Sequence, residues 1–205
     1  MMVDATTTDI PQPPLPIHWA STVARLVEQG WAFIPAALDP VLLRRLDTDN
    51  RREWWPIADE SVARQYGESA FLPFAVADEA VRVLGRQLVH GLSEAARHQG
   101  LPPVPDFTEV TWGRYPQAKG RVTAHRDPVS WRGVVAITTL RGAATFRVLG
   151  RGRRVREWEV AAGALVLLRG AGWPGSKDRG PVHEVDPPSV GERVTLTLRT
   201  SKGGS

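Results

Sequence analysis

The stretch that decides the fold is Arg193-Val194-Thr195-Leu196-Thr197-Leu198-Arg199, which alternates polar and apolar side chains without a break. Because successive side chains of a β-strand point to opposite faces, this alternation predicts a strand with one apolar and one polar face. The polar face carries an arginine at each end. Such a face is either solvated, as on many outer strands, or turned toward an anionic ligand that needs two guanidinium groups.

Upstream of this strand, the chain from about residue 105 breaks into short β-type segments separated by Gly and Pro. These segments are 107–115, 134–140, 144–149, 155–160 and 164–168. No helix-length segment lies between them, which favours an all-β barrel or sandwich over βαβ units. Many short strands in such an order point to a jelly roll.

The N-terminal half has a different pattern. Apolar residues at helical spacing predict helices over 19–29 and from Asp78 to about Gly100. Asp39 followed by Pro40 predicts the start of another helix, and residues 31–34 form a short strand. The stretch between residues 50 and 73 has no clear period.

These patterns predict an α+β fold with a double-stranded β-helix (jelly-roll, cupin-like) core and N-terminal helices packed on it. Residues 1–16, rich in proline, are expected to be a flexible tail. Residues 17–205 are expected to form a single domain, with a mainly helical part at 17–104 and the core at 105–200.

Composition excludes several classes of site. The 205 residues include no cysteine, which excludes disulfide scaffolds, thiolate zinc sites, iron–sulfur clusters and cysteine catalysis. Any metal must therefore be held by histidine and carboxylate. The net charge of +4 is compatible with an anionic substrate and too small to indicate nucleic acid by itself. We see neither a signal peptide nor a membrane span, so a cytoplasmic location is the default expectation.

A metal site is suggested by His125 and Asp127, which are two residues apart. On a strand or at its end, this spacing puts both side chains on one face. His183, which follows a glycine-rich loop, is a candidate third ligand. Two histidines and one carboxylate on one side of an ion form the facial triad of non-haem Fe(II) oxygenases.

The order of these residues resembles that in the Fe(II)/2-oxoglutarate-dependent oxygenases, and within them the AlkB-like branch. The resemblance rests on Tyr115, the triad, and the two arginines that end the alternating strand. It implies that the triad is catalytic and binds Fe(II), that 2-oxoglutarate is the co-substrate and that O2 is the oxidant. It also implies that Arg193 holds the far carboxylate of 2-oxoglutarate, helped by the Tyr115 hydroxyl and by Thr195. Arg199 would lie nearer the metal-chelated end or the substrate.

Two departures from the AlkB pattern bear on the substrate. The asparagine that usually stands two residues before the tyrosine is Gly113 here, and the segment corresponding to the nucleotide-recognition lid, between Trp54 and Pro73, is short. We therefore expect hydroxylation or oxidative demethylation of a small molecule or an amino-acid side chain. The alternatives are an AlkB-like nucleic-acid base demethylase and a cupin-like binding protein without oxygenase activity.

A few further residues are candidates for the pocket or its surroundings. Trp131 follows the His125 and Asp127 pair, and Trp173 lies in the glycine-rich loop before His183; each either lines the pocket or packs in the core. Trp54, Trp55 and Tyr66 either line a substrate pocket or anchor the N-terminal part, which we favour. Arginines 151, 153, 154 and 156 cluster at an expected hairpin tip, where a solvated turn is favoured over nucleic-acid binding. Histidines 18, 90 and 98 have no carboxylate at ligand spacing, and we expect them to be structural or surface residues.

Overall fold

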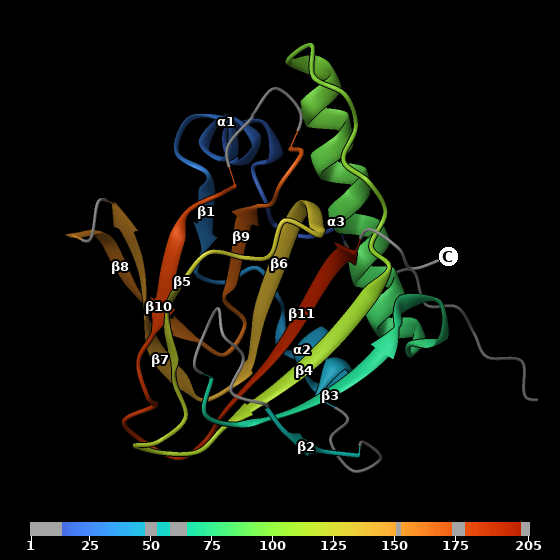
Figure 1. The fold of residues 1–205 in the computed structure, drawn as a ribbon. Coiled ribbons are helices and arrows are strands. Elements are labelled where there is room, and N and C mark those ends of the chain that lie inside the picture. Colours follow the sequence, from blue (N-terminus) through green and yellow to red (C-terminus); the bar gives the residue numbers. More distant parts are fainter. Residues whose placement is uncertain (1–13, 48–52, 58–64, 151–152, 174–178, 202–205) are drawn as a thin grey trace, which may run out of the picture.

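The computed structural model describes residues 14–47, 53–57, 65–150, 153–173 and 179–201. The described residues form helices and strands in the order seen in Figure 1. The helices are α1 (Trp19–Gln29), α2 (Pro40–Leu46), α3 (Glu79–His98) and the 3-10 helix η2 (Phe74–Val76). The strands before residue 130 are β1 (Trp31–Ile34), β2 (Trp55–Pro56), β3 (Glu68–Pro73), β4 (Glu109–Tyr115) and β5 (Val122–His125). Those after it are β6 (Trp131–Arg141), β7 (Ala143–Gly150), β8 (Arg153–Ala161), β9 (Leu165–Arg169), β10 (Val182–Val185) and β11 (Arg193–Ser201).

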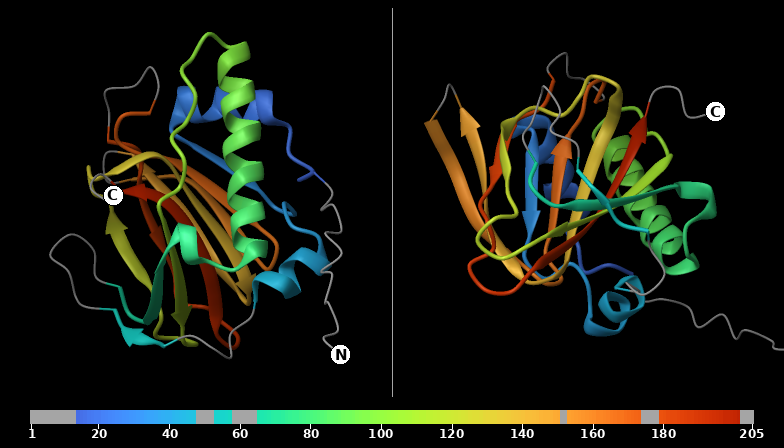
Figure 2. Two further views of the ribbon diagram at one scale, coloured as in Figure 1. Left: turned by 90° about the vertical axis from the view of Figure 1, so that its right-hand side faces the viewer. Right: turned by 60° about the horizontal axis from the view of Figure 1, so that its bottom comes forward.

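The strands form two antiparallel sheets. One has seven strands in the order β1-β9-β6-β11-β4-β3-β2, and the other has four in the order β5-β10-β7-β8. The two sheets face each other across a wedge-shaped interior (Figure 2, right). An apolar cluster that includes Val135, Phe146 and Leu168 joins side chains from both sheets. The interior between the sheets is therefore partly filled, and its remaining space is the cavity described below.

Because residues 193–199 alternate, one face of the larger sheet is apolar at this strand and the other is polar. Val194, Leu196 and Leu198 are buried in a cluster with helix residues, on the face away from the smaller sheet. The polar residues of the same strand face the other way and line the cavity. The polar face of this strand thus looks into the interior rather than to bulk solvent.

Helices α1 and α3 contribute to the cluster on the outer face of the larger sheet. Leu26 of α1 and Leu88 of α3 belong to that cluster together with Trp112 of β4. Figure 2 (left) shows α3 running along this face. Helix α1 is tied to the sheet by Arg169 of β9, whose Nη1 donates to the carbonyl oxygens of Leu26 (3.2 Å) and Val27 (2.7 Å). The Leu26 carbonyl also accepts from the backbone N–H of Gly30 (3.2 Å), and the Val27 carbonyl lies in the last turn, where a helix leaves its carbonyl groups without intrahelical partners.

Several predicted elements are confirmed. Helix α1 spans residues 19–29 as expected, and Asp39 caps α2 by accepting hydrogen bonds from the backbone N–H groups of Val41 (2.7 Å) and Leu42 (2.9 Å). Two elements differ from the expectation. Residues 68–73, for which the sequence shows no clear period, form β3 and pair with β4. His183, expected to follow a loop, lies within strand β10.

Among the described residues, no helix combines the length and the apolar character that crossing a bilayer requires. The expected flexible tail lies almost wholly outside the described residues.

Candidate metal centre and adjoining pocket

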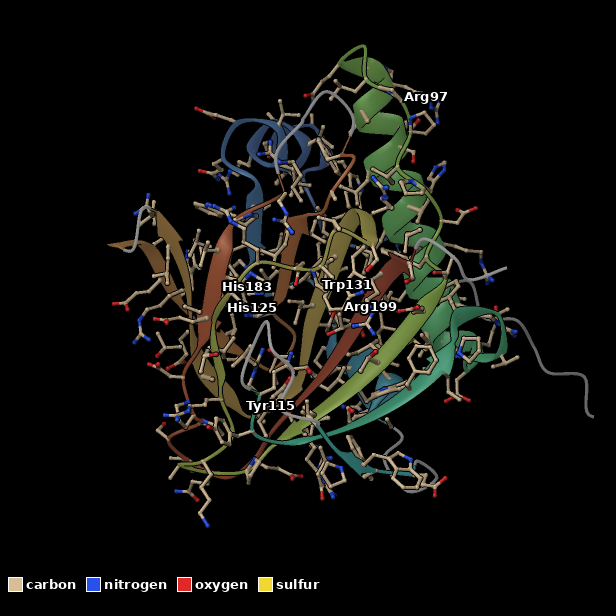
Figure 3. The ribbon with its side chains drawn as sticks, in the orientation of Figure 1. Arg97, Tyr115, His125, Trp131, His183 and Arg199 are labelled. Carbon is tan, nitrogen blue, oxygen red and sulfur yellow. The ribbon has the colours of Figure 1, made fainter. Side chains whose placement is uncertain are left out.

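The smaller sheet brings the two candidate histidine ligands together. Strands β5 and β10 pair antiparallel, with His125 directly opposite His183. The centroids of the two rings are 4.3 Å apart. The chain leaves β5 after His125, and Asp127 turns back toward the same point. Thus residues 58 positions apart in the sequence meet because β5 and β10 are neighbours, as Figure 3 shows for the two histidines.

The donor atoms are spaced as a metal ion requires. The distance from Asp127 Oδ1 is 3.8 Å to His125 Nε2 and 3.8 Å to His183 Nε2. All three candidate donors lie within 4.8 Å of one another. Two donors each bound at about 2.1 Å to one ion are at most about 4.2 Å apart, so small adjustments bring this group onto a single ion. Two imidazoles and one carboxylate are the donor set of a non-haem iron centre.

Hydrogen bonds orient both imidazole rings toward that ion. The Nδ1 atom of His125 lies 2.8 Å from the carbonyl oxygen of Thr123, and Nδ1 of His183 lies 3.4 Å from that of Pro181. With the proton on Nδ1, each ring donates to the backbone and leaves its Nε2 lone pair free for the metal. Phe146 stacks on the His183 ring at an interplanar angle of 6°, which further restricts its rotation.

Burial keeps the imidazoles neutral. The side chains of His125 and Asp127 are each 7% exposed. Burial lowers the pKa of His183 to about 4, and burial with the neighbouring His183 lowers the pKa of His125. Burial raises the pKa of Asp127 to about 6, although His125 and Arg199 act in the opposite direction. At neutral pH the site therefore presents two neutral imidazoles and one carboxylate, which are the protonation states that bind metal.

The triad opens on a cavity of about 230 Å³ between the two sheets. Its walls include the triad and the inward-facing residues of β11, together with apolar side chains of β6 and β7. The buried hydroxyl of Thr111, on the β4 side, has no hydrogen-bond partner among the described residues. The cavity thus combines a metal-binding group with polar atoms that are available to a ligand.

One end of the cavity carries a buried guanidinium group, that of Arg193. Arg193 is only 2% exposed, and its Nε has no hydrogen-bond partner within the described part of the chain. Its Nη2 makes a single long contact, 3.4 Å, to Thr139 Oγ1. The guanidinium carbon lies 5.8 Å from the centre of the Tyr115 ring, and Thr195 is buried on the same face. A buried, nearly unpartnered guanidinium is costly unless an anion completes it.

The other end, beyond the metal ligands, carries Arg199. Its guanidinium carbon lies 4.1 Å from the centre of the Trp131 ring, and its Nε donates to Glu109 Oε2 at 2.7 Å. In Figure 3, Trp131 and Arg199 lie together, well separated from Tyr115. Arg199 therefore lies at the end of the cavity away from Tyr115, and it is already paired with a carboxylate.

The remaining candidates lie outside the cavity. Trp173 is 1% exposed and belongs to the outer core cluster, and Trp54 packs partly against that cluster with Arg114 over its ring. Trp55 and Tyr66 are exposed. Trp173 and Trp54 thus pack in or against the outer core, whereas the exposure of Trp55 and Tyr66 fits neither of the two roles expected for them. Arg126, between the ligands, donates a hydrogen bond to the Gly180 carbonyl. Residues 151–152 lie outside the described residues, as do the side chains of Arg153 and Arg154.

Sequence reasoning missed Phe146, Thr111 and Glu109 as neighbours of the site. Phe146 is the second inward-facing residue of a regular strand, and nothing in its own segment distinguishes it from a core residue. Glu109 could have been anticipated, because it is directly opposite Arg199 in the β4–β11 register.

The fold is similar to that of solved prolyl hydroxylases. A Pseudomonas putida prolyl-4-hydroxylase matches with a TM-score of 0.65 and 23% identity, over 89% of this chain and 98% of that one. A Trichoplax adhaerens prolyl hydroxylase, solved with a peptide of the hypoxia-inducible factor oxygen degradation domain, matches with a TM-score of 0.62 and 15% identity over 89% of each chain. A viral collagen prolyl hydroxylase from Paramecium bursaria Chlorella virus-1, solved with 2-oxoglutarate, matches with a TM-score of 0.57 and 12% identity, over 84% of this chain and 96% of that one. No protein-family model and no curated protein sequence matches the chain.

These likenesses bear on the fold. The sheet-rich antiparallel architecture is that of prolyl hydroxylases with a jelly-roll core, which confirms the predicted core at this level. The AlkB-like branch is not confirmed, because the three neighbours above are all prolyl hydroxylases.

Proposed function

We propose that this chain is an Fe(II)- and 2-oxoglutarate-dependent dioxygenase that hydroxylates, or oxidatively demethylates, a small molecule or an amino-acid side chain. One observation carries the proposal: the buried His125, Asp127 and His183 group opens on the same cavity as the buried guanidinium of Arg193, whose Nε has no hydrogen-bond partner among the described residues. The structural likeness to prolyl hydroxylases, one of them solved with 2-oxoglutarate, supports the same assignment.

In this proposal, different residues along the cavity bind the metal and the co-substrate. His125, Asp127 and His183 hold Fe(II), which with 2-oxoglutarate and O2 supplies the oxidising power for attack on a C–H bond. Arg193 takes the far carboxylate of 2-oxoglutarate through charge-assisted hydrogen bonds, and Tyr115 and Thr195 contribute hydroxyl groups on the same face. The apolar side chains from β6 and β7 keep bulk water away from the reacting atoms.

The size of the cavity favours a small target. Typical ligand pockets measure roughly 300–1,000 Å³, and this cavity of about 230 Å³ must also take the co-substrate. A side chain or a small molecule fits this space better than a nucleobase with its sugar. The peptide bound to the Trichoplax adhaerens enzyme is consistent with an amino-acid side chain as substrate.

The division into a tail and a single domain over residues 17–205 stays a prediction, as does the cytoplasmic location.

Succinate release tests this function. Purified protein loaded with Fe(II) under air should convert 2-oxoglutarate to succinate slowly, and a true substrate should accelerate the conversion. We would screen proline-containing peptides, free amino acids, small metabolites and methylated bases. Loss of all succinate release in Asp127→Ala, with the fold retained, is the expected control. Succinate release at the same rate in wild type and in Asp127→Ala would refute the assignment, and acceleration by methylated bases alone would favour the nucleic-acid alternative.

A further inference from the structure

Tyr115 is surrounded by glycines from separate parts of the chain. On one side, Gly120 approaches so closely that a Cβ on it would lie 2.5 Å from the Tyr115 Cα. On another, a Cβ on Gly67 would lie 2.5 Å from the Arg114 carbonyl oxygen and 3.1 Å from Tyr115 Cδ1. On the third, a Cβ on Gly113 would lie 2.8 Å from Tyr115 Cε2. A contact below about 3.0 Å would force a neighbouring atom to move. The position of Tyr115 therefore depends on these three residues having no side chain.

Among these glycines, Gly113 is the one that lines the cavity. It lies two residues before Tyr115 on β4, so both face the same side of the sheet, and it is directly opposite Thr195 of β11. A Cβ at Gly113 would lie 2.9 Å from the Tyr115 hydroxyl oxygen and 2.9 Å from Thr195 Oγ1. The two hydroxyl groups therefore converge over the bare backbone of Gly113, on the face that also carries Arg193.

A glycine inside a regular strand weakens that strand, so its presence is usually explained by a close approach of another group. Here the approaching groups are the Tyr115 ring, which lies back along its own strand, and the Thr195 hydroxyl. No positive φ angle is involved at Gly113. Steric room is thus what this position provides.

We propose that Gly113 is a positioning residue for the co-substrate: by leaving this space open, it lets the Tyr115 and Thr195 hydroxyls converge beside Arg193, where the far carboxylate of 2-oxoglutarate binds. The inference rests on the proposed function. It concerns only the anion end of the cavity, because Gly113 contacts none of the three metal ligands in these close approaches.

The test measures two affinities by titration calorimetry on the full chain: Co(II) for the metal-free protein, and 2-oxoglutarate for the Co(II)-loaded protein. In Gly113→Ala we expect the dissociation constant of 2-oxoglutarate to rise about tenfold or more, as the loss of a hydrogen bond to a charged group predicts. The Co(II) affinity should stay within about twofold of wild type, because none of the three candidate ligands is among the groups that the added methyl would strike. A purely structural role for Gly113 would affect both affinities or neither.

Gly91→Ala is the matched control, since a Cβ there would overlap the Trp19 ring at the α1–α3 contact, far from the cavity. It should lower thermal stability and leave both affinities unchanged. A second comparison, made in a Tyr115→Ala background, tests the proposal even if Gly113→Ala alone folds poorly. In that background, only the Thr195 hydroxyl is left for the methyl group to strike, so adding Gly113→Ala should lower the 2-oxoglutarate affinity by no more than about threefold.

Wild-type 2-oxoglutarate affinity in Gly113→Ala would overturn the inference, as would a full additional loss of affinity in the double variant. If the wild-type, Co(II)-loaded protein does not bind 2-oxoglutarate at all, the proposed function itself fails. The two failures are therefore distinguishable.

Discussion

Replacing Arg193 by methionine should greatly weaken co-substrate binding and, at the same time, stabilise the ligand-free protein. Burial lowers the pKa of Arg193 to about 10, well below the ordinary guanidinium value. Each tenfold change in the acid dissociation constant corresponds to about 1.4 kcal/mol. Burying the charged Arg193 guanidinium therefore costs about 3 kcal/mol of folding free energy at neutral pH. The sign follows because the group is charged at pH 7 in both states, and its lowered pKa shows that the folded state disfavours the charge.

Part of that gain is offset when the guanidinium is removed. The contact with the Tyr115 ring, with 5.8 Å between the guanidinium carbon and the ring centre, contributes about 1 kcal/mol. Methionine is unbranched and fills the vacated volume with little strain. The net stabilisation is then about 2 kcal/mol, or a rise in Tm of about 4–8 °C for a chain of this size.

The assay is thermal unfolding of the metal-free protein, repeated after loading with Co(II) and 2-oxoglutarate. Saturating 2-oxoglutarate at about 100 times its Kd should stabilise the wild type by about 2.7 kcal/mol and leave Arg193→Met unaffected. Arg199→Met is the matched control. It leaves Glu109 without its ion-pair partner and removes the stacking on Trp131, so it should destabilise the protein by about 1 kcal/mol. The reasoning is refuted if Arg193→Met lowers the Tm and the variant still responds to 2-oxoglutarate.

Further predictions concern the metal ligands and the helices. Because burial raises the pKa of Asp127 to about 6, protons should compete with the metal below that pH, and Co(II) affinity measured by calorimetry should fall about tenfold per pH unit there; a constant affinity between pH 7 and pH 5 would contradict this. Gly91→Ala, which overlaps the Trp19 ring, should cost about 1–3 kcal/mol in urea unfolding, and an unchanged midpoint would show that α1 and α3 are not packed as described. Arg169→Leu removes both hydrogen bonds to the end of α1 and should cost about 2 kcal/mol, with faster amide exchange in α1; equal exchange in both proteins would rule out the tether.

The main features of the fold could be predicted from local patterns where these are strong. Residues 193–199 alternate because one face packs on helices and the other lines a cavity, so β11 was predictable although its surroundings were not. Strand β10 has only four residues and follows a proline, which is too little for a period to show. Residues 68–73 form a strand mainly because β4 provides its partner, and exposed Phe71 and Leu72 obscure the alternation.

The candidate site, too, could be predicted from the sequence only in part. The spacing of His125 and Asp127 and the resemblance to a known family were enough to nominate the triad, whose members the β5–β10 pairing brings together. The closeness of Gly67, Gly113 and Gly120 to Tyr115 depends on how β3, β4 and the turn after β4 fold together, and no local pattern indicates it.

The most direct test of the central claim is an anaerobic titration of the Fe(II)-loaded protein with 2-oxoglutarate, followed by visible absorption. Chelation of the iron should produce a weak charge-transfer band that saturates in the wild type. His125→Ala should show no band, and Arg193→Met should need far more 2-oxoglutarate to reach it. Absence of the band in the wild type, or an identical titration in His125→Ala, would contradict a shared iron and 2-oxoglutarate site in this cavity.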